Sequence, residues 1–313
     1  MSQALPFIVL WLAGLALWCQ PPAAPAQPDR RTRWHRRPPA WVLTCVLAWG
    51  LAWSVGLLDA RGAIAILACI ALSAWWHGNA HRHEGTWVGA LAPWGIGALA
   101  LALALHAVPG VHNPLVLDGV HWRVGDPAFS LRASFDKACA GLMLLATVVP
   151  RGSAASPTRR TGRHGGAQTA QAAALTTAAT LGLAWAWGLT EPARAWPQVP
   201  GQPHALPLFL ALNLFVTCVA EEAFFRGLLQ SALSRRLATR GSLGIAAAIA
   251  LPAALFGLAH LAGGPKMALL ATLVGLGSGW AFARTRRIEA AVLVHFAVNA
   301  VHLLAFTYPA RTG

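Results

Sequence analysis

The sequence predicts an all-α fold, a polytopic integral membrane bundle of about eight to ten transmembrane helices. Three observations lead to this prediction. Of the 313 residues, 56% are hydrophobic and only 11% are charged, whereas a soluble domain carries about 25% charged residues. Apolar runs near the length of about 20 residues that crosses a bilayer recur along the chain. Arginines gather in short clusters between these runs, as in loops that set membrane topology.

The candidate membrane helices are ten apolar runs, judged against the requirement of about 20 residues for a span. They cover residues 5–19, 41–58, 62–77, 87–108, 138–150, 170–188, 206–225, 243–262, 267–283 and 288–308. The runs 5–19 and 138–150 are short enough to be re-entrant or interfacial. The sequence therefore predicts about eight to ten spans.

The basic residues predict a topology with the N-terminus outside. If all ten runs cross, the inner loops hold 17 of the 24 Lys and Arg residues, as the positive-inside rule requires. The net charge of +14 is then a topological signal, and a nucleic-acid partner is not expected. Five arginines follow the first run and none precedes it. This asymmetry favours a retained segment over a signal peptide cleaved near Ala24-Pro25-Ala26.

Two long loops divide the chain. Residues 109–137 are predicted to form a small external loop, and the Arg-, Gly- and Ser-rich residues 151–168 a flexible cytoplasmic linker. We therefore expect an N-terminal transmembrane bundle of unknown role at residues 1–168. A second membrane domain, with the polar residues described next, is expected at residues 169–313.

Two adjacent carboxylates, Glu221 and Glu222, lie deep within an apolar run. The other eight acidic residues fall in loops or at span ends. A carboxylate at the bilayer centre costs at least about 2.5–3.5 kcal/mol, so an intramembrane acid is a functional candidate by default. Glu222 precedes Arg226 by four residues, which is the favourable order for an ion pair on a helix. This pairing leaves Glu221 as the candidate general base.

Further polar residues lie in apolar helices nearer the C-terminus. His295 and Asn299 are four residues apart and share one helix face, which His302 continues. His260 lies near the end of another apolar run and, on a straight helix, would lie nearer the outer face than the carboxylates. Pro252 offers a kink that could bring it back. Because polar residues in spans face the bundle interior, we expect a shared hydrated pocket.

Such a pocket has the groups that peptide hydrolysis needs. Glu221 can take a proton from a water molecule that His260 orients. His295 and Asn299 can donate hydrogen bonds to the developing oxyanion, and preorganised donors of this kind supply about 10²–10³-fold in rate each. A packing role remains the alternative for each of these residues, and is the preferred interpretation of His302.

The polar residues fall into three spaced patterns, namely Glu221-Glu222-Ala223-Phe224-Phe225-Arg226-Gly227, Phe256-x-x-x-His260 and His295-x-x-x-Asn299. In order and spacing they resemble the three signature motifs of the CPBP family, which comprises CAAX prenyl endopeptidases and bacteriocin-processing or immunity proteins. The resemblance covers about residues 205–308. It implies an intramembrane glutamic endopeptidase with Glu221 and His260 activating water, His295 and Asn299 forming the oxyanion hole, and Glu222 and Arg226 in accessory roles.

A zinc-dependent intramembrane metalloprotease is the first alternative, with Glu221, Glu222, His260 and His295 as ligands. The sequence has no His-Glu-x-x-His pattern, and Arg226 beside a cation is unfavourable, so we expect no cofactor and no metal. A serine or cysteine nucleophile is the second alternative, with Ser278 or Cys218 as the candidates. A non-enzymatic transporter or immunity-type protein is the third, because intramembrane acids also serve proton relays.

The expected partners are the lipid bilayer and a membrane-anchored protein or peptide substrate. An Ala- and Arg-rich composition is typical of GC-rich bacterial genomes, which favours a multi-pass protein of the bacterial inner membrane. Bacteria generally lack prenylated proteins, so a prenylated substrate is not expected. The five cysteines lie in or beside apolar runs without metal or disulfide spacing, and are interpreted as small apolar residues.

Overall fold

The computed structural model describes residues 3–18, 39–83, 85–147 and 162–310. The chain divides into two compact units. One comprises residues 1–114 and 134–159, and the other residues 115–133 and 160–313. The proposed cleavage site at residues 24–26 and the expected linker up to residue 161 lie outside the described residues.

The first unit is helical where it is described. It contains α1 (Leu5–Trp18), α2 (Ala40–Ser54), α3 (Ala60–Asn79), α4 (Trp87–Ala104) and α5 (Phe135–Thr147), with a short 3₁₀ turn at Ala80–Arg82. Local sequence explains where two of these helices begin. Asp59 accepts hydrogen bonds from the backbone N–H groups of Arg61 and Gly62 at the start of α3, and Thr86 accepts one from Gly89 at the start of α4.

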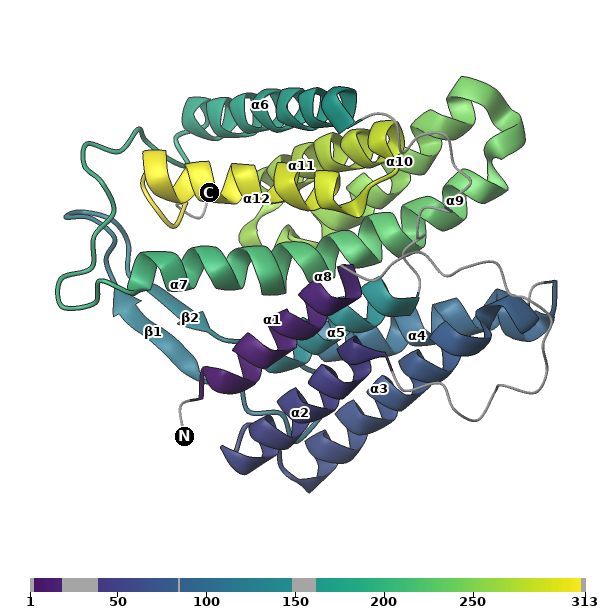
Figure 1. Cartoon of the computed structure of the whole chain (residues 1–313). Helices are drawn as coiled ribbons and strands as arrows, with labels where there is room; N and C mark the ends of the chain where they lie inside the picture. Colours follow the sequence, from purple (N-terminus) through teal and green to yellow (C-terminus); the bar gives the residue numbers. More distant parts are fainter. Residues whose placement is uncertain (1–2, 19–38, 84, 148–161, 311–313) are drawn as a thin grey trace. The chain divides into compact units, whose positions relative to one another are not determined.

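The second unit combines a β-hairpin with seven labelled helices. The hairpin pairs β1 (Leu115–Val120) with β2 (Phe129–Arg132) in antiparallel register. The helices are α6 (Gly162–Ala186), α7 (Ala205–Leu212), α8 (Val219–Glu222), α9 (Ser231–Arg236), α10 (Gly241–Ala259), α11 (Pro265–Thr285) and α12 (Ile288–Ala305). Helices α7, α8 and α9 are parts of one continuous helix, Ala205–Arg236, which Figure 1 shows as an uninterrupted ribbon.

Among the described residues, six helices are long and apolar enough to cross a membrane. They span Ala60–His77, Trp87–Ala104, Ala205–Arg236, Ala238–Ala259, Pro265–Thr285 and Ile288–Ala305. Two further apolar helices, Leu5–Leu17 and Ala40–Ser54, are shorter. Helix α6 is not among the six, because Gln, Thr and Gly residues dilute its apolar ones. The mostly helical membrane fold is thus confirmed, whereas the count of eight to ten spans is not.

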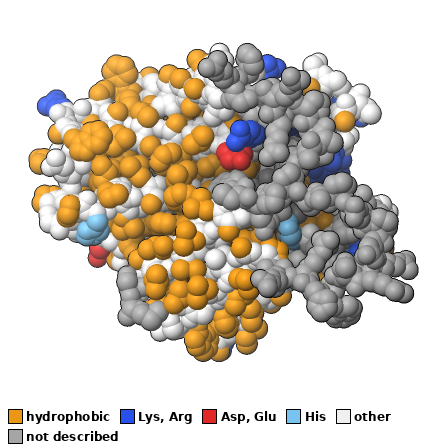
Figure 2. Space-filling model, in the orientation of Figure 1, with side chains coloured by type: hydrophobic (Ala, Val, Ile, Leu, Met, Phe, Trp, Pro, Cys, Tyr) orange, Lys and Arg blue, Asp and Glu red, His pale blue; other side chains and the backbone are white. Residues whose placement is uncertain are grey.

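Many large apolar side chains face outward. Ile64 is 70% exposed on α3, and Leu243 and Leu258 are 72% and 61% exposed on α10. Figure 2 shows hydrophobic side chains over much of the visible surface that the structure describes. A soluble protein rarely exposes so large a contiguous apolar surface, so this distribution fits helices that face lipid.

Small residues allow α10 and α11 to approach closely. The backbone of Gly275 lies against Ala253, and the backbone of Gly257 lies against Thr272, so any larger side chain at either glycine would clash. Such glycines are typical of helix interfaces in membranes, where close van der Waals packing drives association. The earlier residue of α10, Ala253, meets the later residue of α11, Gly275, and the later one, Gly257, meets Thr272. Helices α10 and α11 therefore form an antiparallel pair.

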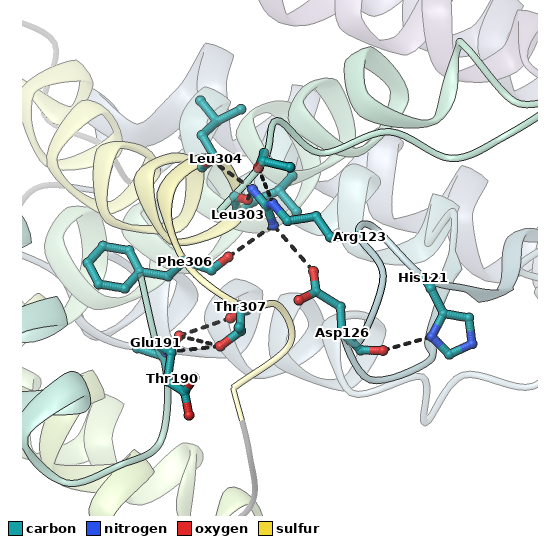
Figure 3. Close-up of polar contacts among 10 residues, drawn as sticks. His121, Arg123, Asp126, Thr190, Glu191, Leu303, Leu304, Phe306 and Thr307 are labelled. Carbon is teal, nitrogen blue, oxygen red and sulfur yellow. Dashed lines mark hydrogen bonds and ion pairs between the residues drawn. The ribbon is translucent and has the colours of Figure 1, made fainter. Parts of the chain in front are cut away.

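The hairpin loop is fastened to the C-terminal end of α12 by one buried arginine, as Figure 3 shows. The Arg123 guanidinium donates to the carbonyl oxygens of Leu303, Leu304 and Phe306 at 2.7, 2.9 and 3.0 Å. Asp126 lies 3.3 Å from the same guanidinium and balances its charge. The last carbonyls of a helix have no partner within the helix. Arg123 supplies one, and thereby fixes the position of the α12 terminus.

This hairpin belongs to the second compact unit, as residues 115–133, whereas the sequence reading placed residues 109–137 with the N-terminal bundle. The physical reason is its aromatic packing. Trp122 and Phe129 both contact Phe209 of α7, at ring-centroid distances of 5.7 Å. Helix α6 begins at Gly162, within the stretch that was expected to be a linker.

Candidate functional site

The carboxylates lie on a helix whose geometry changes on both sides of them. Residues Asn213–Cys218 and Ala223–Gln230 form π-helical turns that flank Val219–Glu222. A π turn brings residues five apart into line, and such turns occur frequently at functional sites. Two side-chain contacts follow this spacing. The Cys218 thiol donates to Asn213 Oδ1 at 3.4 Å, and the Ser231 hydroxyl donates to the Arg226 carbonyl at 3.0 Å.

Glu222 joins two other buried side chains. Its Oε2 lies 3.0 Å from Arg226 Nε, and its Oε1 accepts a hydrogen bond from His295 Nδ1 at 2.9 Å. Glu222 and Arg226 are fully buried, and His295 is 4% exposed. The guanidinium also donates to the Gly275 carbonyl of α11 at 2.8 Å. This group therefore ties the α8 helix to both α11 and α12, and each carboxylate oxygen of Glu222 lies beside one of its two partners.

Glu221 occupies a different environment from its neighbour. Its side chain is 18% exposed, whereas that of Glu222 is 0% exposed. Its Oε2 lies 4.0 Å from Nε2 of His295, on the opposite side of the ring from Glu222. The structure thus separates the two adjacent acids, with Glu222 fully buried in an ion pair and Glu221 partly exposed.

His260 lies directly after the last residue of α10 and is half-buried. Its Nδ1 donates to the carbonyl oxygen of Phe256 at 2.8 Å, which leaves Nε2 as the acceptor nitrogen of the neutral ring. The Phe256 ring lies 4.6 Å from the His260 ring and 5.5 Å from that of His295, measured between centroids. Phe256 therefore brings both imidazoles against one aromatic side chain.

Asn299 lies one helical turn after His295 on α12. Its Nδ2 donates to Asn213 Oδ1 at 3.3 Å and lies 3.9 Å from Cys218 Sγ. Sequence reasoning missed Asn213. The signal was present, because Asn213 is an amide inside the same apolar run as Glu221, but no motif spacing singled it out.

The other polar candidates are engaged elsewhere. His302 contacts the Tyr308 ring at 4.9 Å between centroids, in agreement with a structural role. The Ser278 hydroxyl is fully buried and donates to the Ala291 carbonyl at 3.3 Å. Cys218 is fully buried as well. Neither candidate nucleophile of the second alternative therefore has the accessibility that Glu221 has.

A metal site would need several convergent ligands. Across residues 3–18, 39–83, 85–147 and 162–310, no group of three or more His, Cys, Asp and Glu side chains is arranged to hold a metal ion. Of the four ligands that the zinc alternative requires, Glu222 already accepts from His295 and pairs with Arg226. Both carboxylate oxygens of Glu222 are therefore already beside a partner.

Comparison with known proteins gives a family match within the second half of the chain. Residues 203–301 match the family model described as type II CAAX prenyl endopeptidase Rce1-like. No curated protein and no solved structure matches the chain. The matched segment contains all three of the spaced patterns, from Glu221 to Asn299. The resemblance to the CPBP family is therefore confirmed for this part of the chain, which carries a domain similar to the Rce1-like type II CAAX prenyl endopeptidases.

Proposed function

We propose that this protein is an intramembrane glutamic endopeptidase that hydrolyses a peptide bond in a membrane-anchored protein or peptide. One observation carries the proposal. Of two adjacent intramembrane carboxylates, Glu222 is buried in contacts with Arg226 and His295, while Glu221 is partly exposed beside His295 Nε2. A base must reach a water molecule, so Glu221 is the carboxylate suited to that task.

The proposed reaction begins with a water molecule between Glu221 and His260. Glu221 takes one proton while the water oxygen attacks the scissile carbonyl carbon, and Nε2 of His260 accepts a hydrogen bond that orients the water. The C=O π electrons move to the oxygen. Collapse of the resulting tetrahedral intermediate breaks the C–N bond, and the proton held by Glu221 passes to the leaving amine.

The oxyanion of that intermediate would accept hydrogen bonds from Asn299 and His295. In this role His295 keeps its Nδ1–H on Glu222 and presents an Nε2–H to the oxyanion. The buried charges then balance, with the carboxylates of Glu221 and Glu222 offset by the Arg226 guanidinium and the imidazolium. A neutral group of this kind limits the cost of placing four ionised side chains in a low-dielectric environment.

The substrate is proposed to be a membrane-anchored chain because the site lies on apolar helices. We further propose that the second compact unit, residues 115–133 and 160–313, contains the catalytic part, and that the first unit, residues 1–114 and 134–159, is a membrane bundle of its own. The bacterial inner membrane is the proposed location, with the protein crossing it several times.

The decisive experiment compares Glu221→Gln with Glu289→Gln, a matched change at a partly exposed glutamate of α12. Both variants are reconstituted in vesicles with a library of membrane-anchored peptides, and products are identified by mass spectrometry. We expect the Glu221 variant to lose at least about 10²-fold in cleavage rate, the lower range for a general base. Its melting temperature should stay close to that of the wild type. Retained cleavage by this variant, or no cleavage by the wild type, contradicts the proposal.

A further inference from the structure

We infer that Asn213 is a positioning residue that orients the amide of Asn299 for the oxyanion of the proposed reaction. The inference rests on the proposed function, and it assigns a role to a residue outside the three sequence patterns. Asn213 begins the π-helical turn that ends at Cys218, on the same continuous helix as Glu221.

The contact between the two amides leaves one donor of Asn299 for chemistry. An asparagine amide has two N–H donors on its nitrogen. Asn213 Oδ1 accepts one of them at 3.3 Å, and the same nitrogen lies 3.9 Å from Cys218 Sγ. Sulfur is a weak acceptor. An oxyanion can therefore replace it, while the bond to Asn213 continues to hold the amide plane.

The acceptor itself is held in place by its own helix. The Cys218 thiol donates to the same Oδ1 of Asn213 at 3.4 Å, across the π turn that brings residues five apart into line. Two donors thus converge on one oxygen, and this convergence keeps the carbonyl end of the Asn213 amide toward α12. An ordinary α-helical turn would not align these two side chains.

Two polar contacts join the continuous helix Ala205–Arg236 to α12, and they lie one helical turn apart along α12. His295 bonds to Glu222, and Asn299, one turn later, bonds to Asn213. The two contacts together fix the rotation of α12 about its axis. The contact at His295 sets the distance to Glu221, and the contact at Asn299 sets the direction of the remaining amide donor.

The test is a double-mutant cycle on cleavage kinetics in vesicles. Asn213→Leu removes the acceptor, and Asn299→Leu removes the donor that it is inferred to orient. Because loss of one oxyanion donor costs about 10²–10³-fold, we expect Asn213→Leu to lower kcat by about tenfold to a hundredfold with KM unchanged. In the Asn299→Leu background the same change should have no further effect. Thr217→Val, in the same π turn, is the control and should leave kcat unchanged.

A second variant guards against failure of the leucine variant to fold. Asn213→Ser keeps a hydroxyl that can bond to its own helix but is too short to reach Asn299, so it should lower kcat in the same way. If Asn213 had only a structural role, its substitution would lower the melting temperature. It would also reduce kcat by the same factor with and without Asn299→Leu. Multiplicative losses, or an unchanged kcat in both Asn213 variants, overturn the inference. Retained cleavage in Glu221→Gln would instead overturn the proposed function, so the two failures are distinct.

Discussion

His295 Nδ1 lies 2.9 Å from Glu222 Oε1, while its Nε2 lies 4.0 Å from Glu221 Oε2. One imidazole therefore stands between two carboxylates that are neighbours in the chain, and it bonds directly to the buried one. The local sequence predicted that Glu222 pairs with Arg226, and the structure adds His295 as a second partner. The two acids are consequently expected to respond differently to the same substitution.

Glu222→Gln should destabilise the protein strongly. It removes the carboxylate that lies 3.0 Å from the fully buried Arg226 guanidinium. Breaking a buried ion pair by removing one partner costs about 3–5 kcal/mol, because a buried charge loses its compensation. The free energy of unfolding in detergent micelles, measured with denaturant, checks this expectation. Glu289→Gln is the control, since its pair with Arg287 is exposed and should contribute at most about 1 kcal/mol. Equal stability of the two variants would contradict the buried network.

Phe256→Leu should lower activity more than its effect on packing explains. The Phe256 ring contacts both imidazoles, and it lies 5.3 Å from the Arg226 guanidinium carbon. Leucine keeps most of the volume but loses the aromatic face, at a cost of about 1–2 kcal/mol in stability.

Phe282→Leu is the matched control for that change, because Phe282 is also buried, at 4% exposure, but lies in the last turn of α11. Cleavage rate and melting temperature are measured for both variants. We expect similar losses in melting temperature and a fall in kcat only for Phe256→Leu. A similar kcat in the two variants would show that the ring is not needed to hold the histidines.

Arg123→Ala should loosen the end of α12. The change removes the donor to the carbonyls of Leu303, Leu304 and Phe306, and leaves the buried Asp126 without its cation. The expected loss is about 3–5 kcal/mol, again because a buried charge is left uncompensated. Amide hydrogen exchange should accelerate in the last turn of α12.

Arg123→Lys separates charge from geometry, because an ammonium cannot bridge several carbonyls as a planar guanidinium does. It should recover part of the stability but less of the exchange protection. Arg132→Ala, on β2 of the same hairpin, serves as the control and should leave the exchange of α12 unchanged. Unchanged exchange in Arg123→Ala would reject the role of this contact.

Metal chelators should leave cleavage intact. A base built from Glu221 and His260 needs no metal, and Glu222 is committed to Arg226 and His295. Vesicles are treated with a membrane-permeant chelator, and the cleavage rate is then measured with and without added zinc. Loss of activity that zinc restores would instead favour the metalloprotease alternative.

The sequence by itself determined the membrane class, the two exceptional carboxylates and the three spaced patterns. These features are local, because a run of apolar residues or an i, i+4 spacing can be judged within one helix. The number of spans was less well determined. Helix α6 has the length of a span, but its Gln, Thr and Gly residues lower its apolar character, so length and composition disagree there.

Only the tertiary structure decided which acid bonds to His295, which residue holds Asn299 and what fixes the end of α12. Glu222 and His295 are 73 residues apart, Asn213 and Asn299 are 86 apart, and Arg123 and Leu303 are 180 apart. No spacing rule within one helix links residues so distant. Their contacts arise because small residues let the helices approach and because buried polar groups must find partners wherever the packing places them.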